Sequence, residues 1–248
     1  MKIDLSGQTA LVTGASRGIG RTIAQSLARA GAAVVLMGRD QTSLERLAQE
    51  LIVDGCNAQI AVCDVQDVPA VTRAIAGLAR LNILVNNAGT NIPEPFGQVS
   101  EQHFDQIMNL NLRATFFVTQ AAVQKILETG AGGAIINISS QMGHVGATSR
   151  TVYCASKHAL EGFTKALALE LAPAGIRVVS VAPTFIETDM TRPMLADPTF
   201  GQSVISKIPL GQLGQPQDVA DAVVFLASSH AKFVTGSSLL VDGGWTAQ

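Results

Sequence analysis

Short apolar segments alternate with stretches of helical periodicity along most of this 248-residue chain. In the segments 10–12, 33–37 and 83–85, the apolar residues are consecutive instead of alternating with polar ones. Consecutive apolar residues indicate strands buried on both faces, as in a parallel sheet with helices on each side. We therefore expect an α/β fold, with one doubly wound domain over residues 1–248 and a mainly parallel sheet of about seven strands flanked by helices.

The order of the expected elements shows where a ligand should bind. Strands are expected near 10–12, 33–37, 58–63, 83–85, 134–138, 177–181 and 238–241. Helices are expected near 19–30, 42–53, 69–78, 101–127 (in one piece or two), 152–171 and 216–228. Ligands of such sheets bind outside the carboxyl ends of the strands, at the point where the strand order reverses. The residues that follow each strand are therefore the candidates for a site.

Charge and composition exclude several classes of partner. The net charge is −2 and no Lys/Arg cluster occurs, so nucleic acid and anionic membrane surfaces are not expected partners. No apolar segment is long enough to span a bilayer, and the first residues lack the apolar core of a signal peptide. The three cysteines and four histidines lack metal-ligand spacing. We expect a cytoplasmic protein without a metal site and with reduced cysteines.

A glycine-rich segment, TGASRGIG at 13–20, connects the first strand to the first helix. Glycines permit a tight turn and a close approach to a diphosphate, and the helix N-terminus offers free N–H groups. The spacing is TGxxxGxG and differs from the general GxGxxG fingerprint. A plain strand-to-helix turn is the structural alternative. The expected cofactor contacts are Gly14, Ser16, Arg17, Gly18, Ile19 and Gly20.

The end of the second strand favours a phosphorylated dinucleotide. Gly38 occupies the place where NAD proteins carry an acidic residue for the ribose hydroxyls, so no carboxylate would repel a 2′-phosphate. Arg39 follows at once and Arg17 lies in the glycine loop; guanidinium groups pair well with phosphate. We expect NADP(H) to be favoured over NAD(H). Alternatively, Arg39 is a solvated loop residue and Asp40 caps the next helix.

The only tyrosine, Tyr153, is followed four positions later by Lys157. On a helix these residues share a face, and a fixed positive charge beside a phenol favours the phenolate. Such a pair can act as an acid/base near neutral pH. A packed ring beside a solvated amine is the alternative for the pair taken alone.

The remaining strand ends complete a pattern. Asp64 follows the third strand, Asn86-Asn87-Ala88-Gly89 the fourth and Ser139-Ser140 the fifth, while Asn111 lies in the long helix. With TGxxxGxG and YxxxK, these motifs resemble the short-chain dehydrogenase/reductase family from Leu5 to Gly244. The resemblance implies a Rossmann-type domain that uses a nicotinamide dinucleotide to interconvert a carbonyl and a secondary alcohol.

The resemblance also implies roles for individual residues. Ser140 would hold the substrate oxygen and Tyr153 would exchange a proton with it. Lys157 would bind the nicotinamide ribose and lower the pKa of the tyrosine, and Asn111 would hold a water that connects Lys157 to solvent. Further cofactor contacts would come from Asp64, Val65, Asn87, Ala88, Gly89, Pro183, Thr184, Ile186 and Thr188. A hydroxyl and a phenol suit the negative charge that hydride transfer builds on a carbonyl oxygen.

Structural alternatives exist for the same residues. Ser139 and Ser140 can satisfy backbone groups at a strand end, Asn111 can mark a helix kink and Asp64 can be an N-cap. The chain also departs from the family pattern, because Val179 replaces an asparagine of the sixth strand. Thr184 replaces the glycine that follows the next proline. No proton-transfer group is lost by either change.

Three segments should form the substrate pocket: 90–98, 141–150 and a lid at about 185–210, which contains Met190 and Met194. Gln141, His144 and Arg150 add polarity beside Ser140, although a loop role suits His144 better than catalysis. The small-molecule substrate is expected to be a sugar, sugar acid or polyol. A 3-oxoacyl thioester is the alternative, since the sequence is similar to both gluconate 5-dehydrogenases and 3-oxoacyl carrier-protein reductases.

Family resemblance also implies assembly. It predicts a dimer-of-dimers homotetramer, with the long helix, the Tyr153 helix and the region 241–244 at interfaces. A non-catalytic nucleotide-binding regulator is the competing class of function. The set of Asn111, Ser140, Tyr153 and Lys157 favours the enzyme, because a sensor needs no proton donor.

Overall fold

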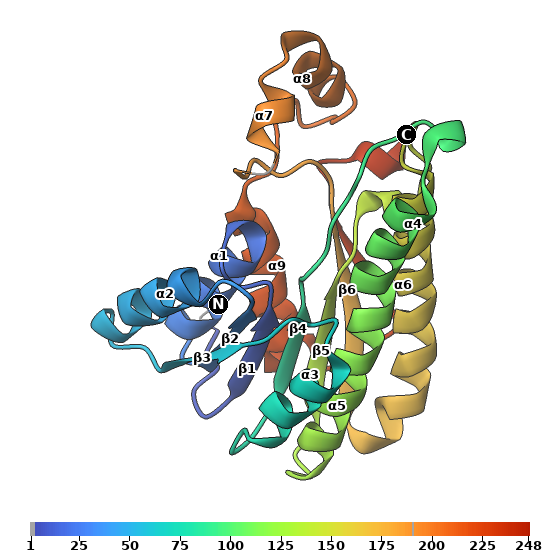
Figure 1. Cartoon of the computed structure of the whole chain (residues 1–248). Coiled ribbons are helices and arrows are strands. Elements are labelled where there is room, and N and C mark those ends of the chain that lie inside the picture. The colour runs from blue at the N-terminus through green and yellow to red at the C-terminus, as the bar shows by residue number, and fades with distance from the viewer. Residues whose placement is uncertain (1–2, 190) are drawn as a thin grey trace.

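The computed structural model describes residues 3–189 and 191–248, and its centre is a parallel sheet (Figure 1). Within these residues the sheet has seven strands in the order β3-β2-β1-β4-β5-β6-β7, and every neighbouring pair is parallel. The strands are β1 (Thr9–Thr13), β2 (Ala33–Gly38), β3 (Ala58–Val62), β4 (Ile83–Asn86), β5 (Gly133–Ile138), β6 (Ile176–Pro183) and β7 (Ser238–Val241). The predicted doubly wound α/β sheet is confirmed. The strand order reverses at β1, between β2 and β4.

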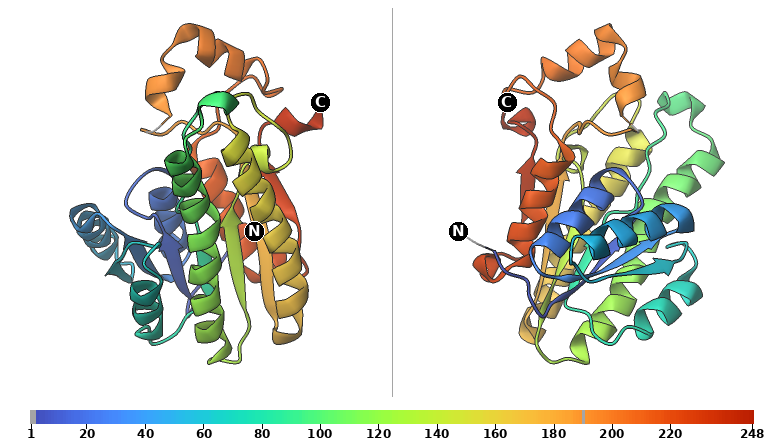
Figure 2. Two further views of the ribbon diagram at one scale, coloured as in Figure 1. Left: turned by 45° about the vertical axis from the view of Figure 1, so that its right-hand side comes forward. Right: turned by 90° about the vertical axis from the view of Figure 1, so that its left-hand side faces the viewer.

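Helices cover both faces of the sheet, as the views in Figure 1 and Figure 2 show. They are α1 (Gly18–Arg29), α2 (Gln41–Val53), α3 (Val68–Ala76), α4 (Glu101–Met108), α5 (Thr115–Leu127), α6 (Thr151–Leu171), α7 (Arg192–Leu195), α8 (Pro198–Ile205) and α9 (Pro216–Ala227). One apolar core joins α1, α2 and α9 to the sheet, and a second joins α3, α5 and α6 to the other face. Neighbours on β1 show the division: Ala10 and Val12 belong to the first core and Leu11 to the second. This two-sided burial explains the consecutive apolar residues.

The long helix expected over 101–127 consists of two helices joined by a wider turn. A π-helical segment, η2 (Asn109–Ala114), separates α4 from α5. A π-helical turn contains an extra residue, and such turns are frequent at functional sites. Asn111 lies in its middle and is 1% exposed. Asn111 therefore lies at a local irregularity of the helix, which is the structural role that the sequence allowed for it.

Buried polar side chains connect the sheet to the helices beside it. The Asn86 Nδ2 at the end of β4 donates to Thr119 Oγ1 of α5 and to Asn137 Oδ1 of β5, each at 2.8 Å. Asn137 Nδ2 then donates to Thr164 Oγ1 of α6 at 2.9 Å. Each buried hydrogen bond is costly to leave unmade, so the chain of amides fixes α6 against β5.

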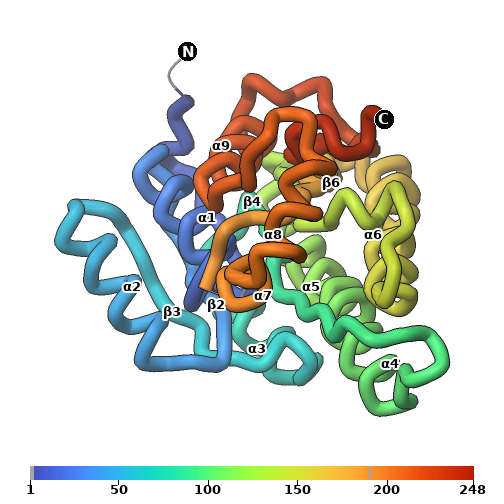
Figure 3. The backbone as a smooth tube through the Cα atoms, turned by 90° about the horizontal axis from the view of Figure 1, so that it is seen from above, coloured from blue at the N-terminus to red at the C-terminus, as the bar shows by residue number. Residues whose placement is uncertain are grey.

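The segment after β6 extends beyond the carboxyl edge of the sheet. Figure 2 shows α7 and α8 projecting above the sheet, and Figure 3 shows them lying over the strand ends when seen from above. Residue 190, which belongs to the expected lid, lies outside the described residues. Within 3–189 and 191–248, no helix is long and apolar enough to cross a membrane.

Candidate active site

A cavity of about 860 Å³ lies at the carboxyl ends of β1, β4, β5 and β6, within the size range of small-molecule sites. All but two of the predicted site residues line it: Gly14, Ser16, Arg17, Gly18, Ile19, Gly20, Arg39, Asp64, Val65, Asn87, Ala88, Gly89, Ser140, Gln141, Arg150, Tyr153, Lys157, Pro183, Thr184, Ile186 and Thr188. Asn111 and His144 do not line it. The cavity lies where the strand order reverses, as the position of the motifs predicts.

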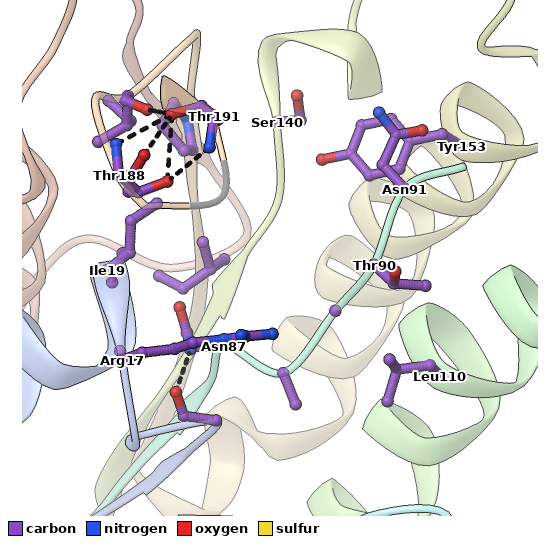
Figure 4. Close-up of a pocket in the computed structure, with 18 of the residues that line it drawn as sticks. Arg17, Ile19, Asn87, Thr90, Asn91, Leu110, Ser140, Tyr153, Thr188 and Thr191 are labelled. Atoms are coloured by element: carbon purple, nitrogen blue, oxygen red, sulfur yellow. Dashed lines mark hydrogen bonds between the residues drawn. The ribbon is translucent and has the colours of Figure 1, made fainter. Parts of the chain in front are cut away.

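The glycine loop has the geometry of a phosphate cradle. Gly14 and Gly18 adopt positive φ angles of 65° and 53°, which other residues rarely adopt. A Cβ added at Gly20 would lie 2.3 Å from both the Gly14 carbonyl oxygen and Asn87 Nδ2. Asn87 Nδ2 in turn donates to the Thr13 and Gly14 carbonyls at 3.0 and 3.2 Å. The loop is thus held close to the end of β4, and the N-terminus of α1 opens toward the cavity (Figure 4).

The end of the cavity beside β2 and β3, where an adenosine is expected, carries mixed charges. Asp40 caps α2, because its carboxylate accepts from Ser43 N at 3.1 Å, as the structural alternative proposed. Arg39 has a side chain that is 73% exposed, and its Nη1 lies 3.6 Å from Asp64 Oδ2. An exposed ion pair of this kind contributes little energy, so the guanidinium can exchange this partner for a phosphate. Gly38 ends β2 without any side chain.

Ser140, Tyr153 and Lys157 meet at the end of β5. Figure 4 shows Ser140 and the Tyr153 phenol on one side of an open space, with Thr188 and Thr191 across it. The Ser140 hydroxyl also donates to Gln141 Oε1 at 2.7 Å and accepts from Met142 N at 3.1 Å. It therefore caps the short helix η3 (Gln141–Gly143) in addition to facing the cavity.

The charge states of Tyr153 and Lys157 are set mainly by burial. Burial raises the pKa of the Tyr153 phenol, while a contact with the Ser140 hydroxyl and the charge of Arg150 oppose that rise. Burial also lowers the pKa of Lys157 to about 8, and Glu161 opposes that decrease. Lys157 Nζ donates to the Ile138 carbonyl at 2.9 Å and lies 5.6 Å from the centre of the Tyr153 ring.

The expected lowering of the tyrosine pKa by Lys157 does not appear in this arrangement. The pKa of Tyr153 is raised instead, because burial disfavours the charged phenolate by more than the nearby polar groups favour it. The ammonium is directed at a backbone carbonyl and not at the phenol oxygen.

Asn111 acts behind the cavity wall. Its Oδ1 accepts from Thr90 N at 2.8 Å, and its Nδ2 donates to the Thr90 carbonyl at 2.9 Å and to Ser156 Oγ at 3.1 Å. The π-helical turn therefore holds the Thr90 backbone, which lines the cavity beside Asn91. The predicted water at Asn111 stays a prediction.

His144 is directed away from the cavity, contrary to the prediction that it binds substrate. Its Nε2 lies 3.0 Å from Ser238 Oγ and 3.4 Å from Glu161 Oε1. Glu161 is buried and also accepts from Ser180 Oγ at 2.7 Å. The partners come from α6, β6 and β7, so the sequence around His144 holds no signal of its orientation.

Several buried polar atoms in the cavity wall lack a hydrogen-bond partner among the described residues. They are Asn91 Oδ1, Ser139 Oγ, Gln141 Nε2, Arg150 Nε and Thr184 Oγ1. Native proteins rarely leave such groups unpaired, and all five residues belong to the cavity wall. Thr184, which replaces the glycine of the family pattern, thus adds a hydroxyl to the cavity wall. Asn91 adds an amide; it belongs to no motif of the sequence and lies only within the expected pocket segment 90–98.

The chain is similar in sequence and in structure to known oxidoreductases. The sequence model of a family described as enoyl-(acyl carrier protein) reductase matches residues 14–246. The chain is 39% identical to L-xylulose reductase from Bos taurus over 248 residues, covering 100% of both. It is 41% identical to 3-oxoacyl-(acyl-carrier-protein) reductase from Rickettsia bellii over 242 residues, covering 98% of each. A solved gluconate 5-dehydrogenase from Burkholderia cenocepacia, in complex with NADP and tartrate, has a TM-score of 0.96 and 35% identity, covering 100% of this chain and 98% of that one.

Proposed function

The chain belongs to the short-chain dehydrogenase/reductase family, and from that premise we propose that it is an NADP(H)-dependent enzyme that interconverts a carbonyl and a secondary alcohol, with Tyr153 as acid/base. The observation that carries this proposal is the meeting of Ser140, Tyr153 and Lys157 in a cavity whose other end is the glycine loop. A regulator without catalysis would not need a hydroxyl and a phenol facing one space.

Each residue of the site is proposed to have a role that follows from its position. A bound nicotinamide dinucleotide supplies or accepts the hydride. The Tyr153 phenol donates a hydrogen bond to the carbonyl oxygen, where negative charge develops during reduction. The Ser140 hydroxyl donates to Gln141 Oε1 in the ligand-free protein and would turn to the carbonyl oxygen when substrate binds. The raised pKa of Tyr153 keeps the phenol protonated at neutral pH, as a proton donor requires. Lys157 holds the ribose and adds a positive charge when protonated.

A substrate panel with Tyr153→Phe as the control tests the mechanism. The wild-type enzyme should change the nicotinamide absorbance with one of a set of sugars, sugar acids, polyols or 3-oxoacyl thioesters. Losing the proton donor should lower kcat by about a hundredfold to ten-thousandfold, with the KM for cofactor little changed. Unchanged turnover in the Tyr153→Phe variant would overturn the mechanism.

The cofactor preference follows from Arg17 and Arg39. Both line the adenosine and phosphate end of the cavity, and Gly38 offers no carboxylate there. We propose NADP(H) over NAD(H), which agrees with the NADP named for the gluconate 5-dehydrogenase structure. Steady-state kinetics with both cofactors should show the preference, and Arg39→Asp should reverse it. A wild-type preference for NADH contradicts the proposal.

The substrate is proposed to be a sugar, sugar acid or polyol. The polar side chains of Asn91, Gln141 and Thr184 in the cavity wall suit hydroxyls better than an acyl chain. L-xylulose reductase and gluconate 5-dehydrogenase among the relatives point the same way. The 3-oxoacyl thioester stays the second candidate, because a 3-oxoacyl-(acyl-carrier-protein) reductase is equally similar in sequence.

We also propose a homotetramer and a mobile lid. Phe104 of α4, Phe116 of α5 and Leu169 of α6 are 46%, 44% and 81% exposed on helices expected at interfaces. Phe116 and Phe163 form a ring pair with centroids 5.5 Å apart. Sedimentation should give a tetramer at micromolar concentration, and a monomer would contradict this. The lid, about 185–210, contributes Thr188, Thr191 and Met194 to the cavity wall and would close over bound substrate.

A further inference from the structure

Arg150 lies at the substrate end of the cavity, three residues before Tyr153 and at the N-cap of α6. Its Nε is buried without a hydrogen-bond partner in the described part of the chain. Its Nη1 donates only to the backbone carbonyl of Ser149, at 3.1 Å. Among the described residues, no carboxylate forms an ion pair with this guanidinium, in contrast to Arg29, Arg39 and Arg192. A buried donor of a charged group normally has a partner.

The backbone before Arg150 is held in an unusual conformation. Ser149 has a φ of 58°, and it is the one non-glycine residue with a positive φ among the residues that the structure describes. Its carbonyl accepts from Glu94 N at 3.0 Å as well as from Arg150. Such conformations cost about 1 kcal/mol or more, and they persist where the surroundings hold them. The residue that follows it, Arg150, lines the cavity.

The acidic residues of the cavity lie elsewhere. Asp40 and Asp64 are at the adenosine end, and Asp189 pairs with Arg192 at 2.8 Å in the lid. The charge of Arg150 also acts on Tyr153, which places it close to the reacting oxygen. The substrate end therefore has a guanidinium close to the proton donor that pairs with no carboxylate of the described residues, and it is available to an anion from outside the chain.

The neighbours of Arg150 suit hydroxyl groups. Gln141 is 2% exposed, its Oε1 accepts from Ser140, and its Nε2 is unpartnered. Asn91 and Thr184 add an unpartnered carbonyl oxygen and an unpartnered hydroxyl to the same cavity. A cation flanked by uncharged donors and acceptors complements a chain of hydroxyls that ends in a carboxylate.

We propose that Arg150 binds the carboxylate of a polyhydroxy acid, so that the substrate is a sugar acid and not a neutral ketose, polyol or acyl thioester. This deepens the proposed function and rests on it. The guanidinium can bind a carboxylate through two parallel hydrogen bonds, which also fixes the distance between the acid group and the carbonyl held by Ser140 and Tyr153.

The test compares aldonates with alditols of the same length and stereochemistry, oxidised with NADP⁺. The wild-type enzyme should prefer an aldonate over its alditol by about tenfold to a hundredfold in kcat/KM, the usual contribution of a charge-assisted hydrogen bond. Arg150→Gln should lower kcat/KM for the aldonate by a similar factor and leave the alditol nearly unchanged. Arg150→Lys should recover part of the loss. Arg29→Gln removes an equal charge outside the cavity and should change neither substrate.

The results separate this inference from the proposed function. Equal use of aldonates and alditols, abolished by Tyr153→Phe, would overturn the carboxylate site and keep the oxidoreductase. A loss in Arg150→Gln that is equal for both substrates would show that Arg150 only supports the fold, and that would overturn the site too. Turnover of 3-oxoacyl thioesters alone would also overturn the carboxylate site and keep the oxidoreductase. If no substrate gives nicotinamide-dependent turnover, both proposals fail.

Discussion

Lys157→Met should make the ligand-free protein more stable while it destroys activity. Lys157 is 6% exposed, and burial lowers its pKa from 10.5 to about 8. A base whose pKa is lowered in the folded state is destabilising wherever it is protonated in both states. A methionine of similar length keeps the packing of the stem and removes the buried charge.

The magnitude follows from that pKa. The difference between 10.5 and about 8 corresponds to roughly 3 kcal/mol at pH 7, at about 1.36 kcal/mol per pKa unit. The substitution also removes the donor to the Ile138 carbonyl, which costs about 1–3 kcal/mol if that oxygen stays buried and unpaired. We therefore expect a net gain of about 1 kcal/mol, or a Tm higher by roughly 2–4 °C.

Denaturant unfolding of both proteins over a range of pH measures this effect. The destabilisation of the folded state by the buried Lys157 ammonium is absent above pH 10.5. It grows as the pH falls toward about 8 and is complete below 8. The free-energy advantage of Lys157→Met should thus be largest at pH 7 and should shrink by roughly 3 kcal/mol as the pH rises past 10. Lys165→Met on the exposed side of the same helix is the matched control and should change stability by less than about 0.5 kcal/mol. A variant that is less stable at pH 7, or an advantage that does not vary with pH, would refute the reasoning.

Two further substitutions test how the site is held. Gly20→Ala should lower the free energy of unfolding by about 1–3 kcal/mol and weaken NADPH binding, because the added Cβ would lie 2.3 Å from the Gly14 carbonyl oxygen. Thermal unfolding measures the first effect and a fluorescence titration the second. Unchanged NADPH binding would contradict the proposal that the glycine loop binds the diphosphate. Asn111→Leu should destabilise by about 2–4 kcal/mol, because it leaves both polar groups of the Thr90 backbone unpaired. It should also raise the substrate KM, whereas a normal KM would show that Thr90 keeps its position without Asn111.

Much of the fold could be predicted because β1, β2 and β4 are apolar on consecutive residues. The two cores on opposite faces of the sheet require that pattern, and the motifs at the strand ends converge because parallel strands end at one edge. The break in the long helix could be anticipated but not its form, since Asn111 in the π-helical turn bonds to the Thr90 backbone, which follows β4 and is remote in sequence.

The errors concern groups whose surroundings come from distant segments. His144 is polar and close to Ser140 in sequence, but Ser238 and Glu161 orient it away from the cavity. Glu161 belongs to no motif of the sequence, although it is buried beside β6 and β7 and acts on Lys157. The direction of the Tyr153 pKa was also wrong, because burial cannot be judged from the spacing of two residues.

The cavity is assembled from strand ends that are remote along the chain, with Gly14 after β1, Asn87 after β4, Ser140 after β5 and Thr188 after β6. A dinucleotide bound in this cavity would contact the early, middle and late parts of the polypeptide at the same time. At a hundredfold excess over its Kd, such a ligand stabilises the folded state by about 2.7 kcal/mol. Unfolding must then release the nucleotide first, so we expect the lifetime of the protein against proteases to follow the cellular supply of its cofactor.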